Sequence, residues 1–160
     1  MSCGGGSISS VTRRSYGYFF DTTEQTASLV NTPYSIMLNT TDLSNGIYIT
    51  SGSRITFLNT GIYDLQFSAQ LSQKSGGTQV ADIWLSYTGS NVPNTNTAIT
   101  VQGTAAKAVA AWDFMFEVKN PYDYVELKWS TPDVGLVLQY ATTGSIHPAV
   151  PSLIVSVIQI

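Results

Sequence analysis

The feature that most constrains this chain is the strict alternation of apolar and polar residues over residues 61–71, GIYDLQFSAQL. The apolar side chains share one parity: Tyr63, Leu65, Phe67, Ala69 and Leu71. The polar side chains share the other: Asp64, Gln66, Ser68 and Gln70. Successive side chains of a β-strand point to opposite faces of a sheet, so this pattern predicts a strand with one buried and one wet face.

The same period of two recurs in residues 80–87, 108–118, 122–129 and 134–141, and turn residues such as Gly, Asn, Pro and Ser separate the segments. No helical stripe is longer than one turn. The pattern predicts an all-β fold: a two-sheet antiparallel jelly-roll sandwich of about ten strands. Five acidic residues are expected on solvent faces of strands: Asp64, Asp82, Asp113, Glu117 and Glu126. Trp84 adds an apolar side chain to the outer face of its strand.

A length of 160 residues fits one domain. Residues 1–14 are rich in Gly and Ser and are predicted to form a flexible N-terminal arm, followed by a jelly-roll domain over residues 15–160. The single cysteine, Cys3, lies in that arm and cannot form a disulfide within one chain.

Charged residues make up 11% of the chain and hydrophobic residues 43%, with a net charge of -3, which argues against disorder. The seven basic residues are scattered along the chain, so no nucleic acid partner is predicted. No apolar run approaches the roughly 20 residues of a membrane-spanning helix, so no membrane insertion is predicted.

No set of residues supports catalysis, and the chain is predicted not to be an enzyme. His147 is the only histidine, and it has no Ser-His-Asp context or second metal-binding histidine. No cofactor is predicted. Calcium is the one metal left open, because Asp42, Asp123 and Asp133 are expected in loops that are rich in oxygen ligands. Three copies of one such Asp could also converge at a symmetry axis.

Two strands carry apolar side chains on both faces. In the closing segment, SLIVSVIQI, the second apolar face consists of Ile154, Ile158 and Ile160, and near the N-terminus it consists of Tyr16, Tyr18 and Phe20. A sandwich strand normally exposes one face to water, so these residues predict an interface with further copies of the chain. The alternative is that the domain's own loops cover them.

The order of these segments resembles the trimeric jelly-roll heads of the complement and tumour necrosis factor superfamily. The resemblance spans nearly the whole chain after about residue 15, and Gly61, Ile62 and Tyr63 leading into Phe67 are its most specific part. A strand ending at Leu85, followed by Gly89 and Asn91, fits the family less closely, because the turn residues are transposed and separated. The resemblance implies a homotrimer with the first and last strands at the three-fold interface.

Four shorter segments are similar to virion proteins of tailed bacteriophages: residues 67–70, 82–85, 94–97 and 108–112. This resemblance implies a structural or adhesive protein on the virion surface, assembled in the host cytoplasm and contacting other capsid or tail proteins. Neither a collagen repeat nor a heptad precedes the head, which favours a capsid decoration (cement) protein. The alternative is a receptor-binding head of a tail fibre or spike. It would recognise a host surface glycan with exposed aromatic residues or with a loop containing Thr88, Asn91, Asn94 and Asn96.

Overall fold

The computed structural model describes residues 14–160, so nearly all of the expected N-terminal arm lies outside the described residues. Within residues 14–160 there are fourteen β-strands and no helix, and ten of the strands have four or more residues. The strands are β1 (Tyr16–Asp21), β2 (Gln25–Thr26), β3 (Tyr34–Ser35), β4 (Thr40–Asn45), β5 (Ile47–Thr50), β6 (Arg54–Phe57), β7 (Gly61–Gln73), β8 (Thr78–Tyr87), β9 (Ser90–Asn91), β10 (Thr97–Gln102), β11 (Ala106–Val118), β12 (Tyr124–Ser130), β13 (Leu136–Leu138) and β14 (Leu153–Gln159).

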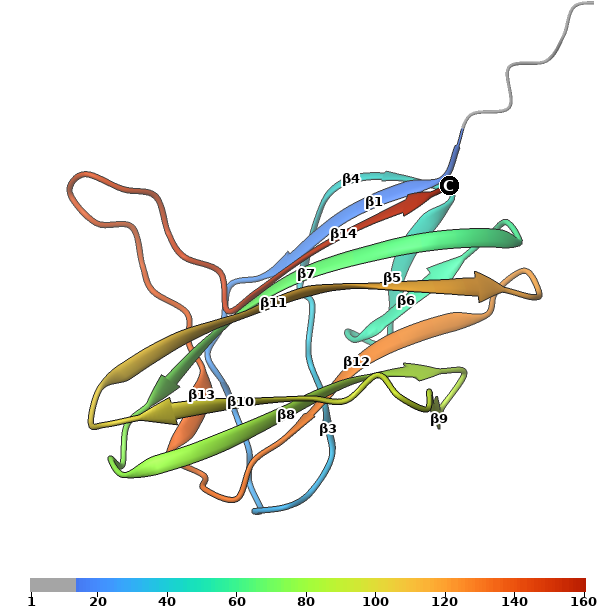
Figure 1. Ribbon diagram of the computed structural model, residues 1–160. Coiled ribbons are helices and arrows are strands. Elements are labelled where there is room, and N and C mark those ends of the chain that lie inside the picture. The colour runs from blue at the N-terminus through green and yellow to red at the C-terminus, as the bar shows by residue number, and fades with distance from the viewer. Residues whose placement is uncertain (1–13) are drawn as a thin grey trace, which may run out of the picture.

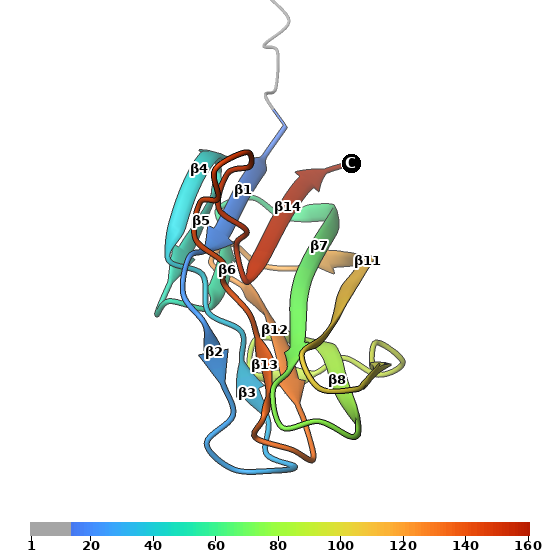
Figure 2. The ribbon, with the colours of Figure 1, turned by 90° about the vertical axis from the view of Figure 1, so that its left-hand side faces the viewer.

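The strands form two antiparallel sheets, which confirms the predicted sandwich. The first sheet has the order β2-β13-β7-β14-β1-β4, and β11 pairs with the other side of β7. The second sheet has the order β10-β8-β12-β6-β5, with β3 beside β12 and β9 beside β8. Figure 1 shows the two layers, and Figure 2 shows β4, β1, β14, β7 and β11 following one another across the first sheet. The last strand therefore lies between the first strand and the central strand β7.

The core lies between the sheets, on the faces predicted from parity. Inward-facing residues of neighbouring strands stand opposite one another across the first sheet: Val155 pairs with Phe67 on one side and with Phe19 on the other. Phe19 and Val155 are fully buried and Phe67 is 4% exposed. Phe57 and Tyr63 pack ring against ring at 4.6 Å between centroids, which joins the two sheets. The core is therefore a continuous layer that both sheets share.

Glu126 is not on a solvent face, contrary to expectation. It is 5% exposed because β3 and the turn after β5 cover this part of β12. Its Oε1 atom accepts hydrogen bonds from the hydroxyls of Ser53 at 2.6 Å and Ser35 at 3.1 Å, and its Oε2 atom lies 3.2 Å from Lys128 Nζ. Burial raises the pKa of Glu126, but the Ser53 hydrogen bond and the Lys128 charge outweigh it and hold the pKa below its usual value.

We predict that Glu126→Gln lowers the free energy of unfolding by about 1–3 kcal/mol. The substitution removes the negative charge that pairs with Lys128, and it can place an amide donor against the hydroxyls of Ser53 and Ser35, which donate to the carboxylate. Glu117→Gln, on the exposed face of β11, is the matched control and should change stability by less than about 0.5 kcal/mol. Chemical denaturation of the two variants measures the difference.

The dependence of stability on acid pH should also change in Glu126→Gln. Since the folded pKa of Glu126 is lowered, its contribution is complete above the unfolded value near 4.5 and is lost as the pH falls through the folded pKa. Stability of Glu126→Gln should therefore fall less than that of the wild type over this acid range. An equal fall in both proteins would mean that the Glu126 contacts do not favour the ionised form.

Candidate functional site

Two surfaces of the molecule carry the predicted site residues, and the first is the outer face of the first sheet. Tyr16 stands opposite Ile158, and Phe20 stands opposite Ile154. Because the residues between them, such as Phe19 and Val155, are fully buried, these four side chains project outward. Tyr18 projects from the same face of β1, and Ile160 follows β14 with its backbone N–H bonded to the carbonyl of Ile62 at 3.0 Å. The structure thus brings the six predicted interface residues together.

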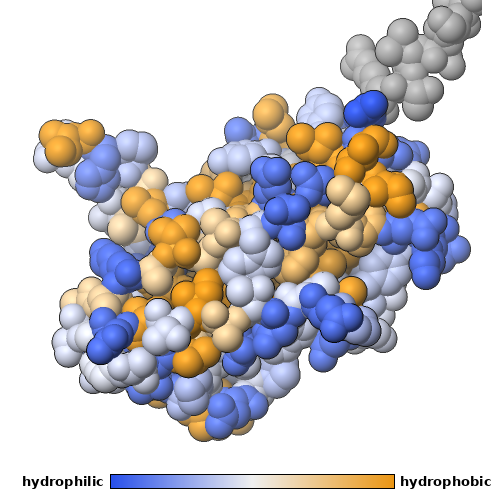
Figure 3. Space-filling view, in the orientation of Figure 1, coloured by the Kyte–Doolittle hydropathy of each residue, from blue (hydrophilic) through white to orange (hydrophobic). Residues whose placement is uncertain are grey.

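Much of this surface is open to solvent. Tyr16, Ile158 and Ile160 are 45%, 55% and 58% exposed, whereas Tyr18 and Phe20 are half-buried. Figure 3 shows hydrophobic surface gathered near the C-terminus, with hydrophilic surface beside it. We refer to the six predicted residues and their neighbours on the outer face of the first sheet as the sheet face. The apolar area covers only part of it.

The sheet face extends further than the sequence analysis predicted. Four exposed apolar residues on neighbouring strands were missed: Leu43 of β4, Ile62 of β7, and Val109 and Met115 of β11. Met115, which is 69% exposed, stands opposite Asp64, and Asp64 stands opposite Ile158. For Val109 and Met115 the sequence contained a signal, because both have the parity of the exposed residues in an alternating strand.

A row of polar residues crosses the sheet face. Asp113, Gln66 and Ser156 occupy paired positions on β11, β7 and β14. In the next row, Asp64 Oδ2 accepts a hydrogen bond from Gln66 Nε2 at 3.3 Å, while Asp64 Oδ1 is buried and has no partner within residues 14–160. A buried acceptor without a partner is costly, so this atom marks a place where a neighbouring molecule could donate a hydrogen bond.

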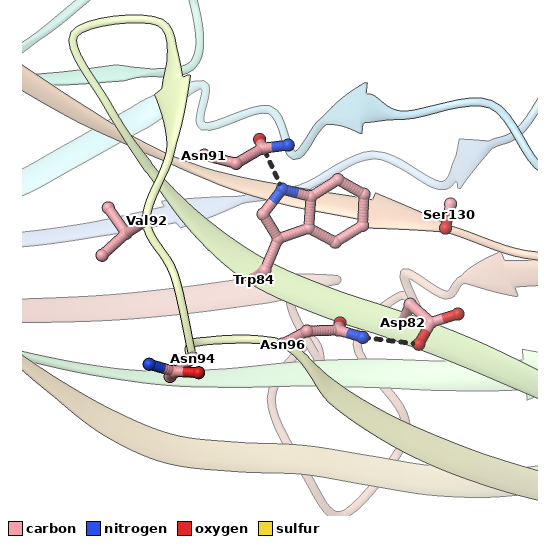
Figure 4. A pocket seen from close by; sticks show the side chains of 7 residues that line it. All are labelled: Asp82, Trp84, Asn91, Val92, Asn94, Asn96 and Ser130. Carbon is pink, nitrogen blue, oxygen red and sulfur yellow. Dashed lines mark hydrogen bonds between the residues drawn. The ribbon is translucent and has the colours of Figure 1, made fainter.

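The second surface is a cavity of about 630 Å³ on the outer face of the second sheet, which we call the Trp84 pocket. Its lining residues come from β8, β9, the segment leading to β10, and β12: Asp82, Trp84, Asn91, Val92, Asn94, Asn96 and Ser130. Figure 4 shows the indole of Trp84 between Asn91 on one side and the pair formed by Asp82 and Asn96 on the other.

Two hydrogen bonds pair four of the side chains that line the Trp84 pocket. The indole Nε1 of Trp84 donates to Asn91 Oδ1 at 2.8 Å, and Asn96 Nδ2 donates to Asp82 Oδ1 at 2.9 Å. Asp82 stands opposite Ser130 on β12. The result is an aromatic ring flanked by an amide and a carboxylate-amide pair. This combination suits a ligand that has both an apolar face and hydroxyl groups.

A tight hairpin builds the wall of this pocket. Thr88 and Gly89 both have positive φ, 45° and 86°, as the two-residue turn of a β-hairpin requires. The turn sends the chain back along β8, where Thr95 Oγ1 donates to the Val92 carbonyl at 2.8 Å and accepts from the Leu85 N–H at 3.1 Å. Asn91 and Asn96 are thereby held over the face that carries Trp84.

Three of the four predicted loop residues, Asn91, Asn94 and Asn96, line the Trp84 pocket, but Thr88 does not. Thr88 instead lines a neighbouring hollow together with Phe116 and Lys119. Trp84 and Asp82 were not among the predicted ligand-binding residues. Their signal was the apolar Trp84 on an otherwise polar strand face.

The candidate calcium ligands lie in different parts of the fold: Asp42 is in strand β4 and not in a loop, whereas Asp123 and Asp133 have structural hydrogen-bond partners. Asp123 Oδ2 accepts from the Tyr87 hydroxyl and from the Asn120 N–H, and Asp133 accepts from Ser75 Oγ at 2.6 Å. The Tyr87 and Ser75 hydrogen bonds are the largest influences that lower the pKa of Asp123 and Asp133. Asp42 is exposed on β4, and residues 14–160 contain no group of three His, Cys, Asp or Glu side chains that could hold a metal ion. A calcium ion on a symmetry axis stays a prediction.

His147 lies exposed in the loop between β13 and β14, with its Nδ1 atom 2.9 Å from the Pro148 carbonyl. This loop projects beyond the sandwich in Figure 1. The residues described in the structure also contain no helix long and apolar enough to cross a bilayer.

Comparison with known proteins gives a likeness of fold. Crystal structures of murine APRIL at pH 8.5 and pH 8.0 superpose with TM-scores of 0.58 and 0.54, at 14% and 13% sequence identity. Each superposition covers 92% of this chain and 100% of that of APRIL. The chain has a jelly-roll fold like that of the tumour necrosis factor superfamily. No protein-family model matches the sequence, and no curated protein matches it.

We predict that Asn91→Ala speeds hydrogen exchange of the Trp84 indole N–H by at least about fivefold, because the substitution removes the acceptor of that hydrogen. Ser90→Ala, at the exposed neighbouring position of β9, is the control and should leave the rate unchanged. Exchange of the indole signal in NMR spectra measures both. Equal rates in the wild type and Asn91→Ala would show that the bond does not persist in solution.

Proposed function

We propose that this protein is a non-enzymatic, homotrimeric head exposed on the surface of a virion. The observation that carries the proposal is the sheet face, where the first and last strands present six aromatic or aliphatic side chains outward. Exposed apolar patches of this kind mark interaction surfaces, and the simplest partner for such a surface is another copy of the chain. The likeness of fold to the tumour necrosis factor superfamily supports the choice of a trimer.

A cyclic trimer needs two different surfaces that fit each other, because each copy contacts one neighbour on each side. The sheet face is one surface. The open edge beside β11 is a candidate for the second, because Trp112 and Phe116 are only half-buried there, next to the core. A stable contact would bury roughly 800 Å² on each partner.

The virion assignment rests on the four segments that resemble phage virion proteins. Within the fold, residues 67–70 lie in the central strand β7, residues 82–85 lie in β8, and residues 108–112 lie in β11. Residues 94–97 lead into β10 and form part of the Trp84 pocket. In this proposal the protein assembles in the host cytoplasm and contacts other capsid or tail proteins.

Two positions on the particle fit such a head: a capsid decoration protein and the receptor-binding head of a tail fibre or spike. Decoration is what the sequence analysis favours. The Trp84 pocket is the specific observation that favours the receptor-binding head, because a decoration protein needs adhesion to the capsid and no ligand cavity. The ligand in that second case is a host surface glycan.

Trimer formation is tested by Ile158→Asp. Wild-type protein at micromolar concentration should sediment with three times the 17.2 kDa chain mass, and Ile158→Asp should sediment as a monomer, because three carboxylates would be buried in the interface. Ile146→Asp is the matched control: Ile146 is 93% exposed in the loop between β13 and β14, outside the strands of the sheet face, and its substitution should leave the trimer intact. A monomeric wild type would contradict the proposal.

The position on the particle is tested with purified virions. A receptor-binding head predicts a few copies per particle and loss of phage adsorption when soluble trimer is added to host cells first. A decoration protein predicts many copies per particle and unchanged adsorption. Quantitative electrophoresis and an adsorption assay measure the two quantities. Absence of the protein from virions would contradict both positions.

A further inference from the structure

We infer that the Trp84 pocket binds a neutral hexopyranose unit of a polysaccharide. This inference deepens the receptor-binding proposal by naming the class of ligand and the residues that hold it. One face of such a sugar ring carries C–H groups, and its rim carries hydroxyls that both donate and accept hydrogen bonds. The pocket offers a surface of each kind: an indole ring and a set of amide and carboxylate groups around it.

The aromatic platform is already oriented. The hydrogen bond from Trp84 Nε1 to Asn91 Oδ1 restrains the half-buried indole with its nitrogen toward Asn91 (Figure 4). A ring held in place before binding loses little conformational freedom when a ligand stacks on it. This is the role that a tryptophan on a wet sheet face can perform and that a core tryptophan such as Trp129, which is 1% exposed, cannot.

The polar groups around the ring offer both kinds of hydrogen bond. Because Asn91 Oδ1 accepts from Trp84, the Nδ2 group of Asn91 is left to donate to a ligand. Because Asn96 donates through Nδ2 to Asp82, its Oδ1 atom is left to accept. Asp82 adds carboxylate oxygens, which bind vicinal hydroxyls in pairs. Donors and acceptors therefore flank the ring together, as a polyhydroxyl ligand requires.

Charge disfavours an anionic sugar. Asp82 is the only charged residue among the seven that line the pocket. The nearest basic side chain on the facing strand, Lys128, stands opposite Trp84 but is paired with Glu126 at 3.2 Å and hydrogen-bonded to Ser35. A carboxylated sugar such as sialic acid would place its negative charge near Asp82 without a free cation to balance it.

The test is an NMR titration with methyl glycosides of glucose, galactose, mannose and N-acetylglucosamine, with methyl sialoside as the anionic comparison. The chain contains three tryptophans, so three indole N–H signals are expected, and single Trp→Phe variants assign them. At least one neutral glycoside should shift the Trp84 signal, with a dissociation constant of about 1 mM or weaker for a single sugar unit. The signals of Trp112 and Trp129 should stay in place, and the sialoside should have no effect.

Substitutions separate binding from folding. Saturation transfer from protein to sugar should disappear in Trp84→Ala. In Asp82→Asn, the affinity for the sugar should fall about tenfold. Asp42→Asn, an exposed strand aspartate on the other sheet, and Trp112→Phe are the matched controls and should bind like the wild type. Thermal unfolding of each variant shows whether the fold is kept.

Three results would overturn the inference: no shift of Trp84 with any of the four neutral glycosides, equal binding by the sialoside, or unchanged saturation transfer in Trp84→Ala. None of these results bears on trimer formation, which the sedimentation of Ile158→Asp tests separately. Conversely, if the wild-type protein were a monomer that still binds sugar through Trp84, the sugar-binding inference would hold and the proposal of a trimeric head would be contradicted.

Discussion

The antiparallel pairing of β14 with β1 on one side and with β7 on the other is the interaction on which the rest of the structure depends. It brings the two ends of the described chain into the middle of one sheet and gives that sheet both of its apolar faces. The inward face, with Val155 and Val157 fully buried, completes the core. On the outward face, Ile154 is half-buried and Ile158 is 55% exposed among residues 14–160, so this face can meet another molecule.

The two candidate surfaces lie on opposite sheets, and this separation is useful for a head that both assembles and binds. The sheet face belongs to the first sheet, whereas the Trp84 pocket belongs to the outer face of the second. Self-association through one layer leaves the other layer open. A trimer of this kind would present three copies of the pocket, and multivalent contact converts weak single-site binding into firm attachment.

Polar residues have different roles in the two sheets. On the first sheet, the row formed by Asp113, Gln66 and Ser156 interrupts the apolar surface, and Asp64 Oδ1 is buried beside it without a partner among the described residues 14–160. On the second sheet, the carboxylate of Glu126 is enclosed by hydroxyls and a lysine, and it ties β3 and the turn after β5 to β12. The first arrangement fits an interface that is completed by a neighbour, and the second fits a fold that is already complete.

Although the strands β2 to β6, β9 and β10 were not predicted, the amino-acid sequence by itself determined the class of fold and the inward faces of the long strands β7, β8, β11 and β12. The reason is that parity is a local property: Leu65 and Phe67 are two residues apart, so one buries with the other in any sheet that contains them. The same local pattern was sufficient to mark β1 and β14 as strands with two apolar faces.

Only the tertiary structure decided which of these faces meet and what surrounds them. Met115 and Val109 join the sheet face because β11 pairs with β7, and Glu126 is buried because β3, more than 90 residues earlier in the chain, pairs with β12. Trp84 and Asp82 become part of a pocket with Asn91 and Asn96 because a hairpin turn brings that loop back over β8. Pairing between distant strands depends on the packing of the whole chain, and no local periodicity encodes it.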